Sequence, residues 1–306
     1  MAYNYKGDGG KDVVYQNNTY DYDAIRTYGG ADEINLKLGQ TYVDAGTGDD
    51  VVKSNIENEN DIYLGDGNDT YTGTGFQTNS NRFDLVYGGT GRDTFNISTS
   101  VSEYYGEGGN DTFNTVGYSN YLNGGNGVDT VSYLRQDNDS YLSGQGVEID
   151  LYNQYAFTGG NREEVLINFE NAEGTSYSDT VIGDYGDNKL WGMNGNDILD
   201  GLGGKDMLYG GNGSDDLYGG GNADRLIGGR GNDVLEGGSG ADFFIFQVAA
   251  DSVVGSKRDV ITDFSRGEGD RIDLSDIDAI KGGGDNDFDF IGAAKFSGTA
   301  GELRFQ

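Results

Sequence analysis

The sequence predicts an all-β protein in which short strands are stacked into a long column. Three observations support this fold class: a nine-residue repeat in the C-terminal half, a related pattern in the N-terminal half, and the absence of proline from all 306 residues. Repeats of this length cannot bury an apolar face alone, so neighbouring units have to stack. Proline cannot donate to a strand ladder, so its absence suits a chain in which nearly every backbone N–H is paired.

The composition excludes several classes of protein. The chain has 52 Asp and Glu residues against 20 Lys and Arg, which gives a formal net charge of −32, and it has no Cys or His. It therefore lacks the residues for a disulfide framework, a zinc site of the usual kinds or a Ser-His-Asp triad. Its charge repels phosphate, so no nucleic-acid partner is expected. No apolar run approaches about 18 residues, so no membrane span is expected.

High net charge with few apolar residues is also typical of disordered chains. The 22 Tyr residues and the missing proline argue against disorder here. The acidic excess then needs an external counter-charge, for which a divalent cation is the simplest candidate.

Seven nine-residue units fill residues 183–245 without an insertion, and one imperfect unit precedes them at 174–182. The seven units read GDYGDNKLW, GMNGNDILD, GLGGKDMLY, GGNGSDDLY, GGGNADRLI, GGRGNDVLE and GGSGADFFI. Position one is always Gly, and position four is Gly except at Asn222. Position six is Asp except at Asn188, and position eight is Leu except at Phe244.

Each recurring position has a chemical reason. Gly allows a tight turn with positive φ that directs carbonyl oxygens inward. Asp adds a hard anionic oxygen beside those carbonyls, which is the donor set that Ca²⁺ prefers. The residues around position eight form a short strand whose middle side chain faces the core.

The N-terminal half repeats the same logic at about twice the period. Gly at position four and Asp at position six recur in seven units, whose aspartates are Asp12, Asp32, Asp50, Asp69, Asp93, Asp111 and Asp129. The units between them keep the apolar residue but mostly replace the Asp, with Thr41, Asn60, Ser102 and Asn120 at that position and Asp84 as the exception.

The pattern GGxGxDxLx resembles the calcium-binding nonapeptide of the RTX (repeats-in-toxin) family of secreted bacterial proteins. The resemblance implies a right-handed parallel β-roll of roughly eleven turns, with two repeats in each turn and Ca²⁺ between stacked turns. Asp side chains and Gly carbonyls would be the ligands. One edge would hold Asn188, Asp206, Asp224 and Asp242, and the other Asp179, Asp197, Asp215 and Asp233, with the weakest site at Asn188.

Two units per turn place the seven N-terminal aspartates on one edge only. The predicted segments are therefore a one-edged roll over 1–133, an insert over 134–173, a two-edged roll over 174–245 and a C-terminal cap over 246–306. Counting the gaps between successive aspartates predicts up to about a dozen Ca²⁺ ions.

The insert leaves the repeat period. Residues 146–153 alternate apolar and polar side chains, which predicts a strand. We expect the insert to pack on the side of the roll, with a protruding binding element as the alternative. Glu163 and Glu164 are expected to be solvated.

The residues after 245 resemble the cap that follows the repeats in serralysin-type proteases and alginate epimerases. An open solenoid end needs an apolar lid, here predicted from Phe244, Phe246, Val260, Ile261, Phe264, Ile272 and Leu274. Asp259, Asp263, Asp270 and Asp273 form either a terminal calcium site or a set of solvated carboxylates. The last residues resemble the beginning of a secretion domain, which would be truncated.

Aromatic residues suggest two surfaces. Position nine places Trp191 and Tyr209 in one column with Ile227 and Ile245, which predicts either a recognition surface for sugars or a partner, or packing under the cap or the insert. Tyr63, Tyr87, Tyr105, Tyr121 and Tyr133 could form a similar platform in the first block.

No HExxH or GxSxG motif occurs, so no catalytic residue is predicted and the chain is not expected to be an enzyme. The leading hypothesis is a module exported by a Gram-negative type I secretion apparatus, which folds on Ca²⁺ outside the cell and acts as a non-catalytic binding or matrix component. The alternatives are the polysaccharide-binding region of a carbohydrate-active enzyme such as an alginate epimerase, or an adhesin or surface-layer segment. The expected partners are calcium and an extracellular polysaccharide or cell-surface matrix.

Overall fold

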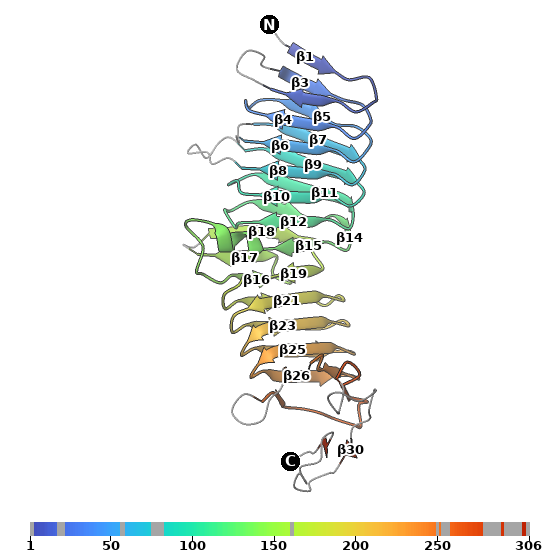
Figure 1. The fold of residues 1–306 in the computed structure, drawn as a ribbon, viewed down its shortest axis with the longest axis vertical. Helices are drawn as coiled ribbons and strands as arrows, with labels where there is room; N and C mark the ends of the chain where they lie inside the picture. The colour runs from blue at the N-terminus through green and yellow to red at the C-terminus, as the bar shows by residue number, and fades with distance from the viewer. Residues whose placement is uncertain are drawn as a thin grey trace.

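The chain forms a long parallel β-solenoid of about twelve turns, which confirms the predicted fold class and is close to the eleven turns expected (Figure 1). The computed structural model describes residues 3–16, 22–55, 59–74, 83–159, 162–248, 251, 258–277, 289–290 and 302–303. These residues contain no α-helix, and therefore no helix that could cross a membrane.

Two sheets run the length of the solenoid. In spatial order, sheet A contains β1 (Tyr3–Lys6), β3 (Tyr22–Arg26), β5 (Tyr42–Asp44), β7 (Asp61–Asp66), β9 (Leu85–Thr90), β11 (Glu103–Gly109), β13 (Tyr121–Asn123), β18 (Arg162–Ile167), β17 (Tyr155–Thr158), β16 (Glu148–Asp150), β20 (Thr180–Ile182), β22 (Ile198–Asp200), β24 (Asp216–Gly221), β26 (Val234–Ser239) and β28 (Val260–Ile261), with β14 (Asn126–Gly127) beside β11. Sheet B contains β2 (Val13–Tyr15), β4 (Glu33–Leu36), β6 (Val51–Ser54), β8 (Thr70–Gly73), β10 (Thr94–Ile97), β12 (Thr112–Thr115), β15 (Thr130–Ser132), β19 (Asn171–Glu173), β21 (Lys189–Asn194), β23 (Met207–Gly213), β25 (Arg225–Gly231), β27 (Phe243–Ile245) and β29 (Arg271–Asp273). A separate pair joins β30 (Asp289–Phe290) and β31 (Glu302–Leu303).

The strand order confirms two repeats in each turn. β21, β23 and β25 are neighbours in sheet B, whereas β22 and β24 lie in sheet A. Leu190 is in register with Leu208, and Leu208 with Leu226, and each of these pairs is two nonapeptides apart. Equivalent positions of alternate repeats therefore stack directly on one another.

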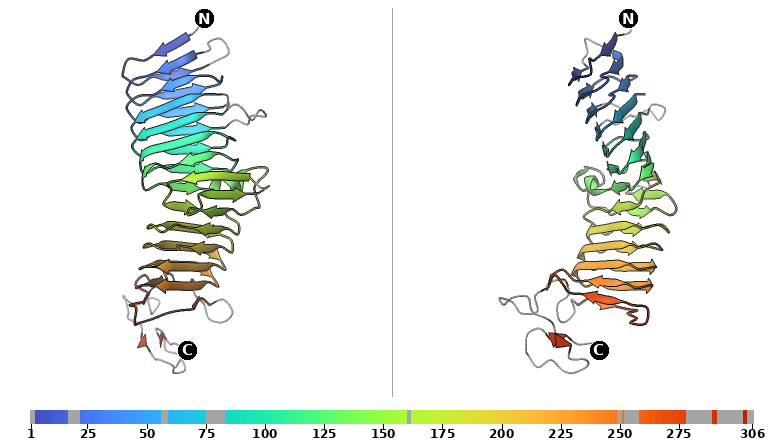
Figure 2. Two further views of the ribbon diagram at one scale, coloured as in Figure 1. Left: turned by 180° about the vertical axis from the view of Figure 1, so that it is seen from behind. Right: turned by 90° about the vertical axis from the view of Figure 1, so that its right-hand side faces the viewer.

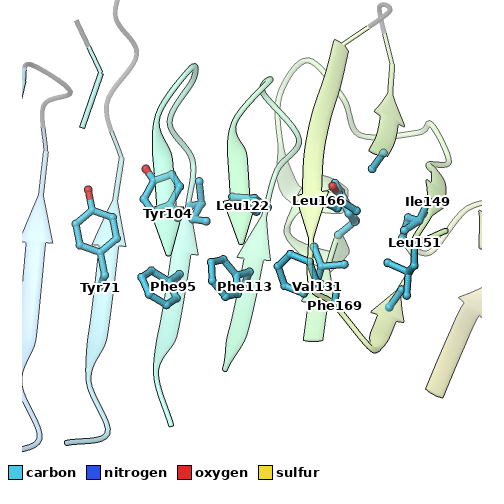
Figure 3. Close-up of a cluster of buried hydrophobic side chains, with 14 of the residues drawn as sticks. Tyr71, Phe95, Tyr104, Phe113, Leu122, Val131, Ile149, Leu151, Leu166 and Phe169 are labelled. Carbon is cyan, nitrogen blue, oxygen red and sulfur yellow. The ribbon is translucent and has the colours of Figure 1, made fainter. Parts of the chain in front are cut away.

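One continuous core fills the space between the sheets. In both halves it is formed mainly by the position-eight side chains, which are buried as the pattern predicts. The N-terminal half supplies the larger ones: Phe95 and Phe113 from sheet B stack at 4.4 Å, and Tyr104 from sheet A packs against Phe95 (Figure 3). The single apolar column explains why no unit could fold alone.

The insert differs from the prediction. Its strands do not lie on the side of the roll but continue sheet A, where β17 pairs antiparallel with both β16 and β18 (Figure 1). Because the chain reverses direction twice, β16 and β18 both run parallel to the other strands of sheet A. β18 pairs in parallel with β13, and β16 pairs in parallel with β20. Ile149 and Ala156 thereby continue the buried column. The short 3₁₀ helix η1 (Leu134–Asn138) precedes these strands.

The described part of the cap adds one more turn. β28 pairs with β26 and β29 with β27, and Phe246 and Ile261 pack against the core. Val260, Phe264 and Ile272 are 42, 40 and 43% exposed, so the predicted lid is only partly formed by these residues. Much of 246–306 lies outside the described residues.

Candidate metal centre

The position-six residues form two ladders along the solenoid. We call the row that precedes the strands of sheet B the B edge, and the row that precedes the strands of sheet A the A edge. In both rows a backbone N–H donates to the side-chain oxygen of the equivalent residue one turn later. Asp206 N donates to Asp224 Oδ1 at 2.8 Å on the B edge, and Asp215 N to Asp233 Oδ1 at 3.0 Å on the A edge.

The B edge is acidic at every rung except Asn188. It contains all seven N-terminal aspartates and then runs through the C-terminal repeats: Asp12, Asp32, Asp50, Asp69, Asp93, Asp111, Asp129, Glu170, Asn188, Asp206, Asp224, Asp242 and Asp270. The structure thus brings the predicted ligands of the first block together on one edge. It also joins that edge to the row that begins at Asn188.

The A edge changes character along the molecule. In the N-terminal half it is mostly neutral, with Thr41, Asn60, Asp84, Ser102, Asn120 and the buried Glu164 linked in order. In the C-terminal half it is acidic, with Asp179, Asp197, Asp215, Asp233 and Asp259. The first half therefore carries one acidic ladder and the second half two.

The second carboxylate oxygen is what makes the ladders a candidate metal centre. Thirteen of the fourteen predicted aspartates have a buried Oδ2 without a hydrogen-bond partner: Asp12, Asp32, Asp50, Asp69, Asp93, Asp111, Asp129, Asp197, Asp206, Asp215, Asp224, Asp233 and Asp242. Apart from Asp12, none of them is more than 2% exposed. A buried carboxylate oxygen without a partner is costly, so each of these oxygens favours a proton or a cation.

Glycine at position one brings a carbonyl oxygen to the same place. A Cβ added to Gly210 would stand 2.6 Å from Asp215 Oδ2 and 2.6 Å from the carbonyl oxygen of Gly228, one turn further on. Side-chain and main-chain oxygens from adjacent turns therefore converge where a side chain is missing. No group of three acidic, His or Cys side chains within metal-binding reach is found in the described ranges. Backbone carbonyls would thus supply much of the coordination, a hard oxygen set that suits Ca²⁺.

Burial sets the protonation of the ladders when no metal is bound. Loss of hydration raises the pKa of Asp197 and of Asp206 to about 8, although each also accepts a backbone N–H that acts in the opposite direction. The same cause raises the pKa of Asp215 and of Asp224 to about 7. Near neutral pH a proton and a cation therefore compete for these oxygens.

The family comparison agrees with this geometry. The model described as RTX calcium-binding nonapeptide repeat (4 copies) matches residues 105–146, 173–208 and 209–244. The chain contains RTX calcium-binding repeats. Such repeats are typical of secreted proteins and are typically non-catalytic, and no catalytic family is identified. No curated protein matches the chain.

Two RTX repeats depart from the common arrangement. Asp179 has no free oxygen, because its Oδ2 accepts the N–H of Thr175 at 2.6 Å and its Oδ1 accepts the N–H of Val147 at 2.7 Å. Asn188 donates its Nδ2 to the carbonyl oxygen of Glu170 at 2.9 Å. An N–H donor thus stands where the other RTX repeats present an anionic oxygen.

At the N-terminal end of the B edge, a tyrosine hydroxyl donates the hydrogen bond that a preceding turn would otherwise supply. Asp12 has no preceding Asp N–H, and its Oδ1 instead accepts the hydroxyl of Tyr5 at 2.8 Å. That hydrogen bond is the main reason why the pKa of Tyr5 rises to about 12. At the other end, Asp259 and Asp270 continue the ladders into the cap, and Asp263 accepts the N–H groups of Gly237 and Gly238.

Sequence reasoning missed two acidic residues of the insert. Glu164, expected to be solvated, is fully buried and accepts hydrogen bonds from Asn120 Nδ2 at 2.8 Å and Tyr133 Oη at 2.9 Å, and burial raises its pKa. Glu170 is a rung of the B edge. The available signal was its spacing, because Glu170 precedes Asn188 by two nonapeptides.

The aromatic columns are stacked ring against ring. Trp191 and Tyr209 lie 5.6 Å apart with their planes at 6°, while Ile227 and Ile245 below them are buried. On the outer face of sheet A, Tyr87 stacks on Tyr63 at 4.8 Å and on Tyr105 at 5.0 Å. Tyr42 and Tyr121 flank this stack, whereas Tyr133 is buried beside Glu164 and does not belong to it.

Proposed function

We propose that this chain is a secreted, non-catalytic binding or matrix module whose roll forms when Ca²⁺ fills the acidic ladders. The observation that supports it is the row of thirteen buried Oδ2 atoms without partners, ten of which lie in repeats that have glycine at position one beside the carboxylate. Such oxygens are tolerated in a folded chain only when their charge is compensated.

Each part of a repeat has one task in this proposal. Oδ1 accepts the N–H of the preceding turn and fixes the orientation of the carboxylate, as in Asp224. Oδ2 and the neighbouring carbonyls would hold the ion. About twelve divalent ions would offset roughly three quarters of the formal charge of −32.

The proposal links folding to the calcium concentration. Without the ion, like charges one turn apart repel and the stacked turns are disfavoured, which suits export of an unfolded chain through a type I apparatus. Extracellular calcium modules bind Ca²⁺ at about 10⁻⁴–10⁻³ M, and the binding free energy then contributes to folding.

Far-UV circular dichroism tests this. The β signal is expected to be weak in EGTA and to return with millimolar Ca²⁺, and equal β content in both would refute the proposal. Asp215→Asn removes one buried anionic oxygen and is expected to lower the number of bound ions, whereas Asp216→Asn, one residue outside the ladder, serves as the matched control.

The alternative roles need separate assays. Binding to alginate and to neutral glycans would support a polysaccharide-binding region, and calcium-dependent self-association would support an adhesin or surface-layer role. The faces of Tyr63, Tyr87 and Tyr105 stack on one another, so a sugar would meet ring edges and hydroxyl groups there.

A further inference from the structure

The insert rejoins the roll at the B edge, between Asp129 and Glu170. Asp129 precedes β15, the last sheet-B strand before the insert, and Glu170 precedes β19, the first one after it. Asp129 N donates to Glu170 Oε2 at 2.7 Å, so the ladder continues across the 41 residues that separate the two positions. Glu170 lies outside the segments that match the RTX repeat.

The oxygens at this step are arranged as they are within the repeats. Asp129 is fully buried, and its Oδ2 has no hydrogen-bond partner. A Cβ added to Gly124 would stand 2.6 Å from Asp129 Oδ2 and 2.2 Å from the carbonyl oxygen of Asn168. The equivalent point at Gly210 meets Asp215 Oδ2 and the carbonyl oxygen of Gly228. The carbonyl of Asn168 therefore takes the place of a position-one glycine carbonyl.

The local sequence reaches this arrangement by a different route. In a repeat, four residues separate the position-one glycine from the Asp, whereas only Phe169 separates Asn168 from Glu170. Asn168 adopts a φ of 55°, a left-handed conformation that Asn tolerates better than most residues. The side chain of Glu is one methylene longer than that of Asp, which compensates for the shorter connection. Phe169 anchors the turn, because its ring packs edge-on against Phe113 at 5.1 Å.

The polar side chains next to the Asp129–Glu170 pair on both edges already have hydrogen-bond partners. One turn further along the B edge, Asn188 Nδ2 donates to the carbonyl oxygen of Glu170 and to Asp184 Oδ1. On the A edge, Glu164 is satisfied by Asn120 and by the hydroxyls of Thr115 and Tyr133. The anionic oxygen that lacks a partner at this level is Asp129 Oδ2.

We propose that a Ca²⁺ ion binds between Asp129 and Glu170, with the carbonyl of Asn168 as a further ligand, and fastens the insert to the roll. This inference rests on the proposal that the ladders bind calcium. The ion would close residues 130–169 into a loop held at both ends. It would also join the one-edged and two-edged halves, since the B edge would otherwise lack an ion at two successive steps.

The test compares three variants of the full chain: Glu170→Gln, Glu170→Asp and Glu163→Gln. Glu163→Gln is the matched control, because it removes the same charge from an exposed residue of the insert that lies in β18, away from the B edge. Bound Ca²⁺ per chain is counted after equilibrium dialysis, and hydrogen exchange of residues 139–147 is followed by mass spectrometry. Glu170→Asp keeps the negative charge but shortens the side chain by one methylene, so the carboxylate no longer reaches the site. This second variant tests the site even if Glu170→Gln does not fold.

We expect both Glu170 variants to bind about one Ca²⁺ fewer than the control. If the calcium concentration is ten times the dissociation constant of this site, the bound ion slows opening of the insert by about tenfold. The hydrogen-exchange rate of residues 139–147 should therefore be about tenfold higher in the Glu170 variants than in the control. An unchanged ion count in either folded Glu170 variant, with wild-type exchange, would overturn the junction site. If the wild-type chain binds no calcium, the proposed function itself fails, so the two failures are distinguishable.

Discussion

Within each ladder carboxylate the two oxygens have different surroundings. Oδ1 of Asp224 accepts the N–H of Asp206, and Oδ2 of the same residue is buried without a partner. An amide oxygen can perform the first task, as Asn60 does for Thr41 on the neutral A edge. It cannot supply the negative charge of the second oxygen. Asn at position six thus keeps the ladder but removes the anion.

The raised pKa values predict how pH acts on the metal-free roll. An Asp titrates near 3.9 in an unfolded chain, whereas burial raises the pKa of Asp206 and Asp197 to about 8 in the fold. The folded state therefore binds more protons between these values, and its stability falls as the pH rises through them.

Calcium-free protein, prepared by dialysis before the pH is set, should accordingly be more stable and show a larger far-UV circular-dichroism β signal at about pH 5 than at about pH 8. Saturating Ca²⁺ should remove this advantage, because the ion replaces the protons. Equal stability at both pH values without calcium would contradict the assignment of these carboxylates as buried and uncompensated.

In the nonapeptides of the C-terminal half, close approach of oxygen atoms requires glycine at position one. A Cβ at Gly219 would lie 2.6 Å from the carbonyl oxygen of Gly237 and 2.7 Å from Asp224 Oδ2. Gly219→Ala is therefore expected to destabilise the calcium-loaded roll by about 1–3 kcal/mol. Gly221→Ala is the control, since its nearest neighbours are 3.8 Å away, and it should change stability by less than about 0.5 kcal/mol. Thermal denaturation in millimolar Ca²⁺ measures both, and equal effects would refute the steric explanation.

The sequence was sufficient to place the candidate ligand residues of the repeats on their edges, because the spacing alone determines their positions. Asp206 and Asp224 are two nonapeptides apart, and the parallel stack converts this spacing into one edge. Glu170 keeps the same spacing from Asn188, but its residue type concealed it. Glu164 could not be assigned from spacing, because the antiparallel strands of the insert break the period, and its burial depends on where the chain re-enters sheet A.

At the level of strands, the tyrosine stack on sheet A is the clearest outward-facing element. β7, β9 and β11 place Tyr63, Tyr87 and Tyr105 in register, with Tyr87 between the other two. Parallel pairing repeats one outward position at every rung, so identical side chains meet face to face. The stack therefore contributes to the cohesion of the sheet as well as to its surface.

Tyr87→Ala removes two stacked pairs and should cost about 2 kcal/mol, because each aromatic pair contributes roughly 0.5–1.5 kcal/mol beyond its buried area. Tyr87→Phe should keep most of this stability, and Tyr141→Ala, at a residue that is 74% exposed, serves as the control. The measurement is urea denaturation in millimolar Ca²⁺. If Tyr87→Ala is no worse than Tyr141→Ala, the stack does not stabilise the sheet.

The insert marks the limit of prediction for single elements. Alternation over 146–153 correctly indicated a strand, now β16, with Ile149 facing the core. The antiparallel strand β17 was not anticipated, since its role is to reverse the chain twice inside a sheet built from parallel neighbours. This reversal is a property of the sheet topology, and no repeated pattern in the sequence indicates it.

The two halves of the solenoid follow one another along its long axis (Figure 2). They differ in the number of acidic residues per turn. Each turn of the first half has acidic residues on one edge and mainly amides or hydroxyls on the other, which need no ion. The turns of the second half have acidic residues on both edges, except at Asn188. We therefore expect the second half to depend more strongly on calcium per turn.

Hydrogen exchange during a calcium titration should resolve this difference. As Ca²⁺ is lowered, amides of β22–β25 are expected to lose protection before those of β6–β11, because more buried charge per turn is left uncompensated. Simultaneous loss of protection in both halves would indicate that the roll behaves as a single cooperative unit.

The contact between Tyr5 and Asp12 gives the solenoid a polarity. Between aspartate rungs, the ladder hydrogen bonds run from a backbone N–H to the side-chain oxygen of the following turn, so the B edge has an acceptor end at Asp12 and a donor end at Asp270. At the acceptor end the Tyr5 hydroxyl occupies Asp12 Oδ1. A further turn added before Asp12 would have to displace that hydroxyl, and a turn added after Asp270 would have to displace the carbonyl oxygen of Ser265, which accepts the N–H of Asp270 at 3.3 Å. Both ends of the B edge are thus capped within the chain, so lengthening the solenoid at either end requires the loss of a cap.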